Sequence, residues 1–260
     1  MYRAAGTEPI FFPMAANPAL YRPVATAPRY EATFAGQRYA ERPGSILALR
    51  EAGIDAHAFG SNWIEAGPAT VTAAGTKAPG PAGASRHGGP WNTLVRAVSM
   101  TLRGRNPLLA ARDRREWDRL RTRHAAALHG PTTDEGYVAL FSEGRISLGF
   151  MMLGDTHRTR HPLRQVRLRE FEGPMSGAFY LTGWIEELAL HYEIGKEIVC
   201  YRSREEMVDL CRYYLAHETE RERIRRAGHE RARRDHTWQR RFEDLFATLG
   251  RDGVLRRADS

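Results

Sequence analysis

The sequence predicts an α/β protein in which a parallel, Rossmann-like sheet carries helices on both faces. Short apolar runs, each long enough for one strand, alternate with helical patterns along most of the chain. The strand-like runs end at glycine or polar residues, and several helical patterns begin at a capping residue. Strands and helices that alternate at this spacing are typical of a parallel sheet covered on both sides.

The first half of the chain predicts two strands and three helices around a long loop. Residues 1–27 are rich in Pro and Ala without periodicity, which indicates a linker. Residues 65–90 are dominated by Gly, Pro, Ala and Thr, so they predict a flexible surface loop. The expected elements are a strand at 31–36, a helix at 42–52, a strand at 55–59, and helices at 93–102 and 106–128.

The second half continues the alternation. Thr132 with Glu135, and Ser203 with Glu206, have the spacing of a capping box and predict the starts of two helices. Residues 151–166 are polar and are expected to form a loop above the sheet. The other expected elements are strands at 146–150, 178–182 and 197–201, helices at 170–175 and 184–191, and a last helix with the apolar stripe Trp238, Phe242, Leu245, Phe246 and Leu249.

The net charge of +8 comes mostly from arginine, concentrated in residues 103–123 and 221–241. This charge favours an anionic partner, which could be a phosphate-bearing small molecule, a nucleic acid or a membrane surface, and it does not choose among them. Most of these arginines stand beside acids, as on a solvated helix face with neighbouring ion pairs. The basic runs lack the interleaved aromatic residues on which single-stranded nucleic acids stack, so no nucleic-acid partner is expected.

Cysteine content and hydropathy indicate the compartment. Cys200 and Cys211 fall in a predicted strand and a predicted helix, where they are expected to be small buried residues in a reducing environment. No stretch approaches the roughly 18 to 20 apolar residues that span a bilayer, and the N-terminus lacks a charged segment followed by an apolar core. These features predict a cytoplasmic protein without a transmembrane segment.

One stretch, residues 168–238, carries a resemblance to a known family. It contains a Phe-Glu pair at 171–172, a small-residue turn at Ser176-Gly177, Gly195-Lys196-Glu197, and Asp235-His236-Thr237-Trp238. This order resembles the C-terminal, nucleotide-sugar half of two-domain (GT-B) glycosyltransferases, and most closely their CgeB-like (spore maturation) branch. The resemblance extends upstream: Ala16-Asn17-Pro18 and Arg22-Pro23 look like the tail of the acceptor domain, and residues 33–36 like the first strand of the donor domain.

The resemblance implies the domain organisation. Residues 1–27 would be a linker or the remnant of an acceptor domain, 28–250 a nucleotide-sugar-binding domain of the GT-B C-terminal type, and 251–260 a disordered tail. Only some 25 residues precede the first donor-domain strand, so the chain looks like a truncated family member. In the family the last helix packs on the other domain, so we expect this helix to self-associate or to bind a separate acceptor-domain protein.

The first predicted site segment directly follows the first strand, at the carboxyl edge of the sheet where ligands of such folds bind. It contains Gly36, Arg38 and Arg42. Guanidinium groups hold phosphate oxygens through paired hydrogen bonds, so both arginines are candidates for clamping a diphosphate. The alternative for Arg38 is an ordinary loop arginine.

The second segment runs from Glu172 to Gly177. In the family a glutamate five residues before a glycine binds the ribose hydroxyls of the nucleotide, and Glu172 and Gly177 have that spacing, with Ser176 between them. A carboxylate has two acceptor oxygens for vicinal hydroxyls, and glycine lets the backbone approach a ligand. The alternative is that Glu172 is only an acid favoured at a helix start.

The sequence does not decide the roles of several other residues near the predicted site. The wider family has a second glutamate, which contacts the transferred sugar, at the position of Arg164. Arg169 either binds phosphate or pairs with Glu170. Asp155, His157 and His161 are expected to be ordinary polar loop residues. No metal-binding motif is present, so neither a metal nor a cofactor is expected, and no catalytic residue is assigned.

The sequence therefore predicts a glycosyltransferase that transfers a sugar from a nucleoside-diphosphate sugar, its substrate, to an acceptor. Catalysis would come from positioning and from neutralising the leaving diphosphate. One alternative is a non-catalytic nucleotide-sugar-binding remnant or partner subunit of such an enzyme. A third is an arginine-rich nucleic-acid-binding protein.

Overall fold

The computed structural model describes residues 9–64, 101 and 104–251, and it confirms the predicted fold class. Six parallel strands form one sheet in the order β3-β2-β1-β4-β5-β6. The predicted loop 65–90, nearly all of the predicted helix 93–102 and the tail from 252 lie outside the described residues. The strands are β1 (Tyr30–Ala35), β2 (Ala56–Phe59), β3 (Leu128–His129), β4 (Gly144–Leu148), β5 (Tyr180–Gly183) and β6 (Val199–Tyr201).

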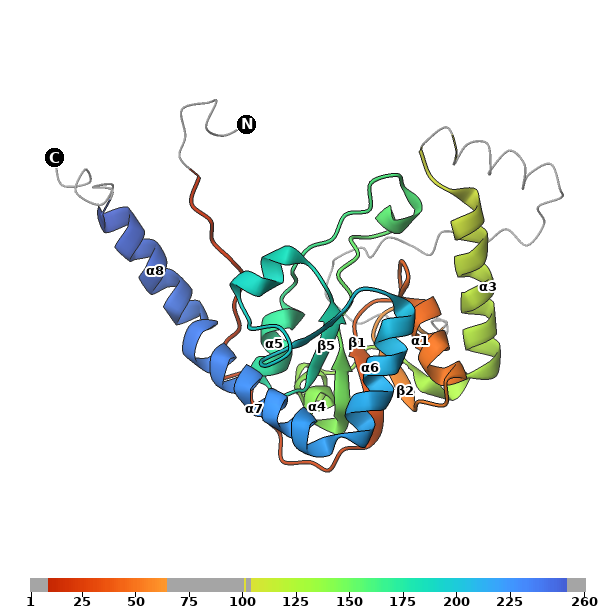
Figure 1. Cartoon of the computed structure of the whole chain (residues 1–260), viewed down its shortest axis with the longest axis horizontal. Helices are drawn as coiled ribbons and strands as arrows, with labels where there is room; N and C mark the ends of the chain where they lie inside the picture. The colour runs from red at the N-terminus through yellow and green to blue at the C-terminus, as the bar shows by residue number, and fades with distance from the viewer. Residues whose placement is uncertain (1–8, 65–100, 102–103, 252–260) are drawn as a thin grey trace, which may run out of the picture.

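Helices lie on both faces of the sheet (Figure 1). On one face α1 and α6 contact the strands, and α3 packs on α1. On the other face lie α4 and α5, and α7 packs against α5. The helices are α1 (Arg42–Glu51), α3 (Pro107–Arg123), α4 (Asp134–Glu143), α5 (Arg169–Met175), α6 (Arg204–Ala216), α7 (Glu218–Asp235) and α8 (Trp238–Arg251), with 3-10 turns η2 (Ala125–Ala127), η3 (Thr156–Arg158) and η4 (Glu186–Leu190).

The strand order reverses beside β1. From β1 the chain proceeds outward through β2 to β3, and then returns through α4 to β4 on the other side of β1. In open parallel sheets, ligands bind in the crevice outside the carboxyl ends of the strands at such a reversal. The fold thus marks the ends of β1 and β4, and the loops that follow them, as the place to search for a site.

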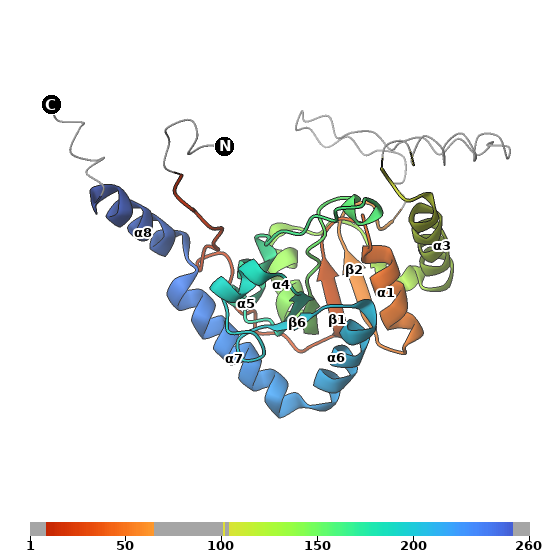
Figure 2. The ribbon, with the colours of Figure 1, turned by 45° about the horizontal axis from the view of Figure 1, so that its top comes forward.

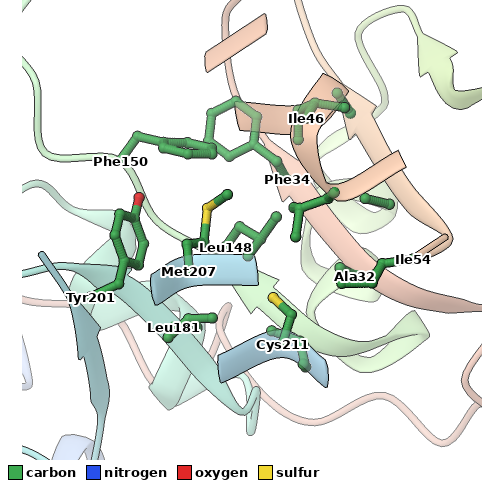
Figure 3. Close-up of a cluster of buried hydrophobic side chains, with 14 of the residues drawn as sticks. Ala32, Phe34, Ile46, Ile54, Leu148, Phe150, Leu181, Tyr201, Met207 and Cys211 are labelled. Carbon is green, nitrogen blue, oxygen red and sulfur yellow. The ribbon is translucent and has the colours of Figure 1, made fainter. Parts of the chain in front are cut away.

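The larger core lies between the sheet and the α1, α6 face (Figure 3). Phe34 of β1 and Leu181 of β5 contribute buried side chains from the sheet, and Ile46 of α1 and Met207 of α6 meet them from the helices. On α6 the buried residues Met207, Cys211 and Tyr214 lie on the face that packs on the sheet. This packing fixes the positions of β1 and β4, whose carboxyl ends border the crevice.

The predicted helix 106–128 is too long. Asn106 caps α3 by accepting hydrogen bonds from the backbone of Leu108 and Leu109, and the helix ends at Arg123. Three alanines form the short turn η2, and Leu128 then pairs with Ala58 in the sheet as part of β3, a strand the sequence did not predict. Alanine and leucine favour a helix locally, but the pairing with β2 overrides that preference.

Two other helix predictions were partly wrong. The cap of α4 is Thr133 and not Thr132, because Thr133 Oγ1 accepts from Gly136 N at 3.1 Å. Gly136 has no side chain to return a bond, so no capping box forms. Residues 184–191 form only the five-residue turn η4. By contrast, Ser203 caps α6 as predicted, at 3.1 Å from Glu206 N.

The middle of the N-terminal segment (residues 9–24) is packed, although the sequence indicated a linker. Ala16 N donates to His236 O at 2.9 Å, and Ala16 O accepts from Trp238 N at 3.3 Å. Farther out, the Phe12 ring lies 5.4 Å from that of Phe242. The segment therefore runs beside the start of α8, which extends away from the sheet (Figures 1 and 2). Within the described ranges, no helix is both long and apolar enough to cross a membrane.

Candidate functional site

Two adjoining cavities lie at the carboxyl edge of the sheet. The first, of about 300 Å³, is lined by Met14, Tyr137, Gln165, Arg167, Leu168, Arg169 and Glu172. The second, of about 270 Å³, lies over the ends of β1 and β2, and its lining includes Gly36, Phe59, Gly60, Pro131, Tyr137 and Arg169. Because Tyr137 and Arg169 line both cavities, the two adjoin and together form the candidate site at the reversal in strand order.

Arg169 stands at the first residue of α5, with Glu172 one turn further along the same helix. Residues three apart on a helix are neighbours on its surface, so the cation and the carboxylate face the first cavity together. The Arg169 Nε is buried and has no hydrogen-bond partner among the described residues. Burial lowers the pKa of this guanidinium, but Tyr180, Tyr137 and Glu170 outweigh burial and raise the pKa above its usual value. The group is therefore a fixed cation.

Glu170 does not form the ion pair with Arg169 that the sequence left open. Its Oε2 accepts from Arg167 N at 2.8 Å, and its Oε1 accepts from Thr182 Oγ1 at 3.3 Å. The side chain is fully buried, and burial raises its pKa, although the Arg169 charge opposes that rise. Glu170 thus anchors the start of α5 to β5, and Arg169 keeps its donors directed at the cavities.

Two further guanidinium groups lie near Arg169. Arg42 is 1% exposed and donates to Gln37 O at 2.7 Å and Tyr39 Oη at 2.6 Å. Burial, then Arg169 and Arg167, lower its pKa to about 10. Arg167 donates to Met152 O at 2.7 Å. The charges of Arg167 and Arg169 thus act on Arg42, and these two residues give the first cavity positive charge beside the carboxylate of Glu172, which favours an anion next to the two arginines.

Glu172 is 8% exposed and lines the first cavity. Tyr137 Oη donates to its Oε2 at 2.7 Å. The ring of Tyr21, from the N-terminal segment, packs edge to face on that of Tyr137 at 6.5 Å. Burial raises the pKa of Tyr21, and the nearby Glu172 raises it further. Tyr137 therefore orients the carboxylate, with Tyr21 packed against the Tyr137 ring.

Of the predicted site residues, Gly36, Arg169 and Glu172 come together at these cavities. Arg38 lines a separate cavity of about 230 Å³, beside Trp117. Its guanidinium lies 4.2 Å from the centroid of the Trp117 ring, and its Nε donates to Asn62 O at 2.6 Å. Arg42 is occupied by internal partners, as described above. Phosphate binding by Arg38 and Arg42 stays a prediction, and neither lines the cavities that contain Arg169.

Ser176 and Gly177 lie at the opposite end of α5 from Arg169, and neither lines the two cavities. Gly177 has a positive φ of 75°, which favours glycine, and a Cβ there would lie 2.9 Å from Pro23 Cγ. Its carbonyl accepts from Arg225 Nη1 at 2.9 Å. In this structure, Gly177 lets the N-terminal segment approach the end of α5.

The polar loop after β4 is tied down by ordinary contacts, as expected. His157 Nε2 and Arg158 Nε both bind Asp113 Oδ2 at 2.7 Å, which fastens the loop to α3. The sequence missed Arg167, Tyr137 and Tyr21 as site residues. Tyr137 stands in the first turn of the helix that follows β3, so its position depends on the strand that the sequence did not predict.

Comparison with known proteins places this geometry in context. A family model described as glycosyl transferase-like matches residues 86–247, more than half of the chain. No curated protein shows significant sequence similarity to the chain.

Solved structures share the fold at low identity. Sucrose-phosphate synthase from Thermosynechococcus elongatus superposes with a TM-score of 0.54 at 13% identity, covering 96% of this chain and 53% of that one. Anabaena HepE in complex with UDP-glucose superposes with a TM-score of 0.54 at 10% identity, covering 91% of this chain and 56% of that one. A glycosyltransferase from Rickettsia africae superposes with a TM-score of 0.52 at 9% identity, covering 92% of this chain and 56% of that one. The sheet is thus that of GT-B structures, and the chain spans about half the length of each.

Proposed function

Because the chain belongs to the glycosyl transferase-like family, we propose that it binds a nucleoside-diphosphate sugar in the two adjoining cavities and transfers the sugar to an acceptor. One observation carries the proposal. Arg169 and Glu172 stand one helical turn apart and face the same cavity, at the strand reversal where this fold class binds ligands. The pair matches the two polar parts of such a donor, an anionic diphosphate and a ribose.

Arg169 is the proposed diphosphate ligand. Its side chain lines both cavities, remains charged, and has a buried Nε without a hydrogen-bond partner among the described residues. Arg167 lines the same cavity and adds positive charge. A diphosphate in this position would relieve the repulsion among the three neighbouring guanidinium groups. Bidentate bonds to phosphate oxygens are the interaction for which a guanidinium is best suited.

Glu172 is the proposed ribose ligand. Its carboxylate can accept hydrogen bonds from two vicinal hydroxyls in addition to the one from Tyr137. Tyr137, which bonds to Glu172, also lines the second cavity. There Phe59 and Pro131 provide apolar surface beside the backbone of Gly60. We place the nucleotide base there, because a flat aromatic ring fits between apolar side chains and exposed peptide groups.

Transfer requires the bond between the sugar and the diphosphate to break, so negative charge grows on the leaving phosphate. Fixed cations stabilise that charge without having to reorganise during the reaction. Arg169 and Arg167 would supply this effect, and the bound geometry would align donor and acceptor. The proposal needs no cofactor, because the nucleotide sugar is the substrate.

The finer family assignment also belongs to this proposal. We place the chain in the CgeB-like branch, with residues 28–250 as the donor-binding domain, on the sequence pattern of 168–238. We further propose that α8 provides the contact to an acceptor-binding unit or to a second copy. Phe242 and Phe246 on this helix are 46% and 54% exposed, which supports a contact there.

A melting screen tests the proposal. The chain is heated with UDP, GDP, ADP and their glucose conjugates, and a ligand that binds the folded state raises the melting temperature. The expected result is a rise for one family of nucleotides, absent with nucleosides alone. Release of that diphosphate from its sugar in the presence of acceptor mixtures then separates a transferase from a non-catalytic binder. No shift with any nucleotide contradicts the proposal.

A further inference from the structure

Arg169 and Glu172 carry opposite charges one turn apart on α5, yet they do not pair. Both line the first cavity, and their spacing of three residues is one at which opposite charges on a helix usually attract each other. Within the part of the chain that the structure describes, no ion pair joins the two side chains. Another contact therefore competes for the carboxylate.

That contact is the hydrogen bond from Tyr137. Its Oη donates to Glu172 Oε2 at 2.7 Å, a short distance of the kind that a charged acceptor gives. Burial raises the pKa of Tyr137, and the charge of Glu172 raises it further, so the phenol keeps the proton that it donates. The carboxylate is thus held through one oxygen by a neutral group.

The position of Tyr137 is fixed by its own helix. Thr133 caps α4, and Tyr137 N donates to Thr133 O at 2.8 Å in the first turn. The Tyr137 ring packs edge to face on Phe141 at 5.2 Å and on Tyr21 at 6.5 Å. Helix α4 therefore brings to the cavity a donor whose place does not depend on α5.

From these contacts, and resting on the proposed function, we infer that Tyr137 is a positioning residue that keeps Glu172 from pairing with Arg169. The bond to Oε2 holds the carboxylate ready for ribose hydroxyls and leaves the guanidinium ready for phosphate. Without the Tyr137 hydroxyl, the carboxylate would turn to Arg169, because the opposite charge one turn away would have no competitor. Recognition of the ribose and of the diphosphate would then weaken together.

The first test needs no ligand. Crystal structures of the wild type and of Tyr137→Phe are compared, since this substitution removes the hydroxyl and keeps the ring that packs on Phe141. We expect an ion pair between Arg169 and Glu172 in the variant and none in the wild type. A carboxylate that keeps its place in the variant, or an ion pair already present in the wild type, overturns the inference.

Binding of inorganic pyrophosphate, which has no ribose, tests the consequence for Arg169. Dissociation constants are measured by calorimetry for the wild type, Tyr137→Phe, Glu172→Gln and the double variant. We expect Tyr137→Phe to weaken binding about tenfold, because the guanidinium then bonds to a carboxylate. Glu172→Gln should strengthen binding far more in the Tyr137→Phe background than in the wild type, because only there does it also release Arg169. Equal gains in the two backgrounds contradict the inference.

Nucleoside diphosphates and their 2′-deoxy forms test the consequence for Glu172. We expect the wild type to prefer the ribonucleotide and Tyr137→Phe to lose about tenfold of that preference, the loss typical of a bond to a charged group. A variant that keeps the full preference would show that the hydroxyl does not position the carboxylate.

Tyr213→Phe is the matched control. Its hydroxyl also bonds to a carboxylate, Glu220 Oε2 at 2.8 Å, and it lines neither cavity. This variant should bind pyrophosphate and discriminate against the deoxy form as the wild type does. If the wild type binds neither pyrophosphate nor any nucleoside diphosphate, the proposed function fails, and the comparison of ligand-free structures still decides whether Tyr137 keeps the two charges apart.

Discussion

Arg169 lies directly against Gly36, at the end of β1. A Cβ added to this glycine would stand 2.7 Å from Arg169 Nη1 and 2.8 Å from Phe34 Cζ. The absence of a side chain at Gly36 therefore gives the guanidinium its position over the strand end. This contact joins the first residue after β1 to the first residue of α5, across the reversal in strand order.

The first prediction concerns that contact. In Gly36→Ala the methyl group should push the Arg169 guanidinium aside, since the end of a long side chain moves more easily than the backbone. We expect nucleoside diphosphate affinity to fall at least fivefold, with unfolding free energy changed by less than about 1.5 kcal/mol. Calorimetry and denaturant unfolding measure the two quantities. Gly250→Ala on α8, where nothing lies within 4 Å of the added Cβ, is the control.

The second prediction separates Arg169 from Arg38. Arg169→Ala should weaken nucleoside diphosphate binding by about tenfold or more and leave nucleoside binding nearly unchanged, because a guanidinium here addresses phosphate oxygens. The sequence made Arg38 a candidate for the same role and left phosphate binding by Arg169 open; the structure places Arg38 beside Trp117 in a separate cavity. Arg38→Ala is therefore the informative comparison. A larger loss for Arg38→Ala than for Arg169→Ala would restore the sequence-based assignment.

The third prediction concerns Glu172. Glu172→Gln keeps the size of the side chain and removes the charge that strengthens bonds to ribose hydroxyls, at a cost of roughly 1.5 to 3 kcal/mol in binding. Nucleotide affinity should fall about tenfold or more, as measured by calorimetry. An unchanged dissociation constant in a folded variant would leave Glu172 as an acid at a helix start and nothing more.

The sequence predicted those parts of the fold and of the candidate site that depend on local pattern. Strand β1 ends at Ala35, one residue before the predicted end at Gly36, and α5 starts at Arg169, one residue before the predicted start, so the sequence placed both sides of the crevice to within one residue. The roles of side chains that meet across the fold were not predictable in this way. Arg38 and Arg169 are both arginines at the sheet edge, and only the packing of Trp117 and Gly36 distinguishes them.

Long-range contacts explain the remaining omissions. Tyr21 and Glu172 are separated by most of the chain, and no periodicity links them. The turn at Asn17 that positions Tyr21 has the composition of a linker. It is held by hydrogen bonds to Ser142, His236 and Trp238, which are far away in the sequence, so no local pattern indicates it. Strand β3 was missed for a similar reason: its two residues become a strand only by pairing with β2.

The fourth prediction is a pH dependence of stability. At the junction of α7 and α8, His236 Nε2 donates to His191 O at 2.8 Å, and its Nδ1 accepts from Arg241 Nη2 at 2.8 Å. The neutral ring satisfies both contacts, whereas a proton on Nδ1 would oppose Arg241. Burial, with the nearby charge of Arg241, lowers the pKa of His236 to about 4, although the hydrogen bond to the His191 carbonyl opposes the fall.

The sign follows from linkage. An unfolded histidine takes up its proton near pH 6.5, so the unfolded state binds more protons than the folded state between about pH 6.5 and 4. Stability should be full above that range and fall by up to a few kcal/mol through it. In His236→Gln, whose amide can make both contacts without titrating, urea unfolding should show a smaller fall from pH 7 to pH 4.5. His217→Gln on the exposed surface should follow the wild type, and parallel curves for all three chains would contradict the assignment.

The last prediction concerns the apolar stripe of α8. Phe12 lies 6.2 Å from Trp238 and 5.4 Å from Phe242 between ring centroids, so the N-terminal segment covers the start of the stripe. Phe242 and Phe246 nevertheless remain about half exposed. Exposing a row of aromatic side chains to water is unfavourable, and self-association would bury them against a second copy of the chain.

We expect the purified chain to form dimers or larger species at tens of micromolar, as measured by light scattering. Phe242→Glu should shift it to a monomer, and Ala247→Glu, at an exposed position on the opposite face of the same helix, should not. A chain that is monomeric at that concentration, and unaltered by Phe242→Glu, would show that the stripe needs no partner.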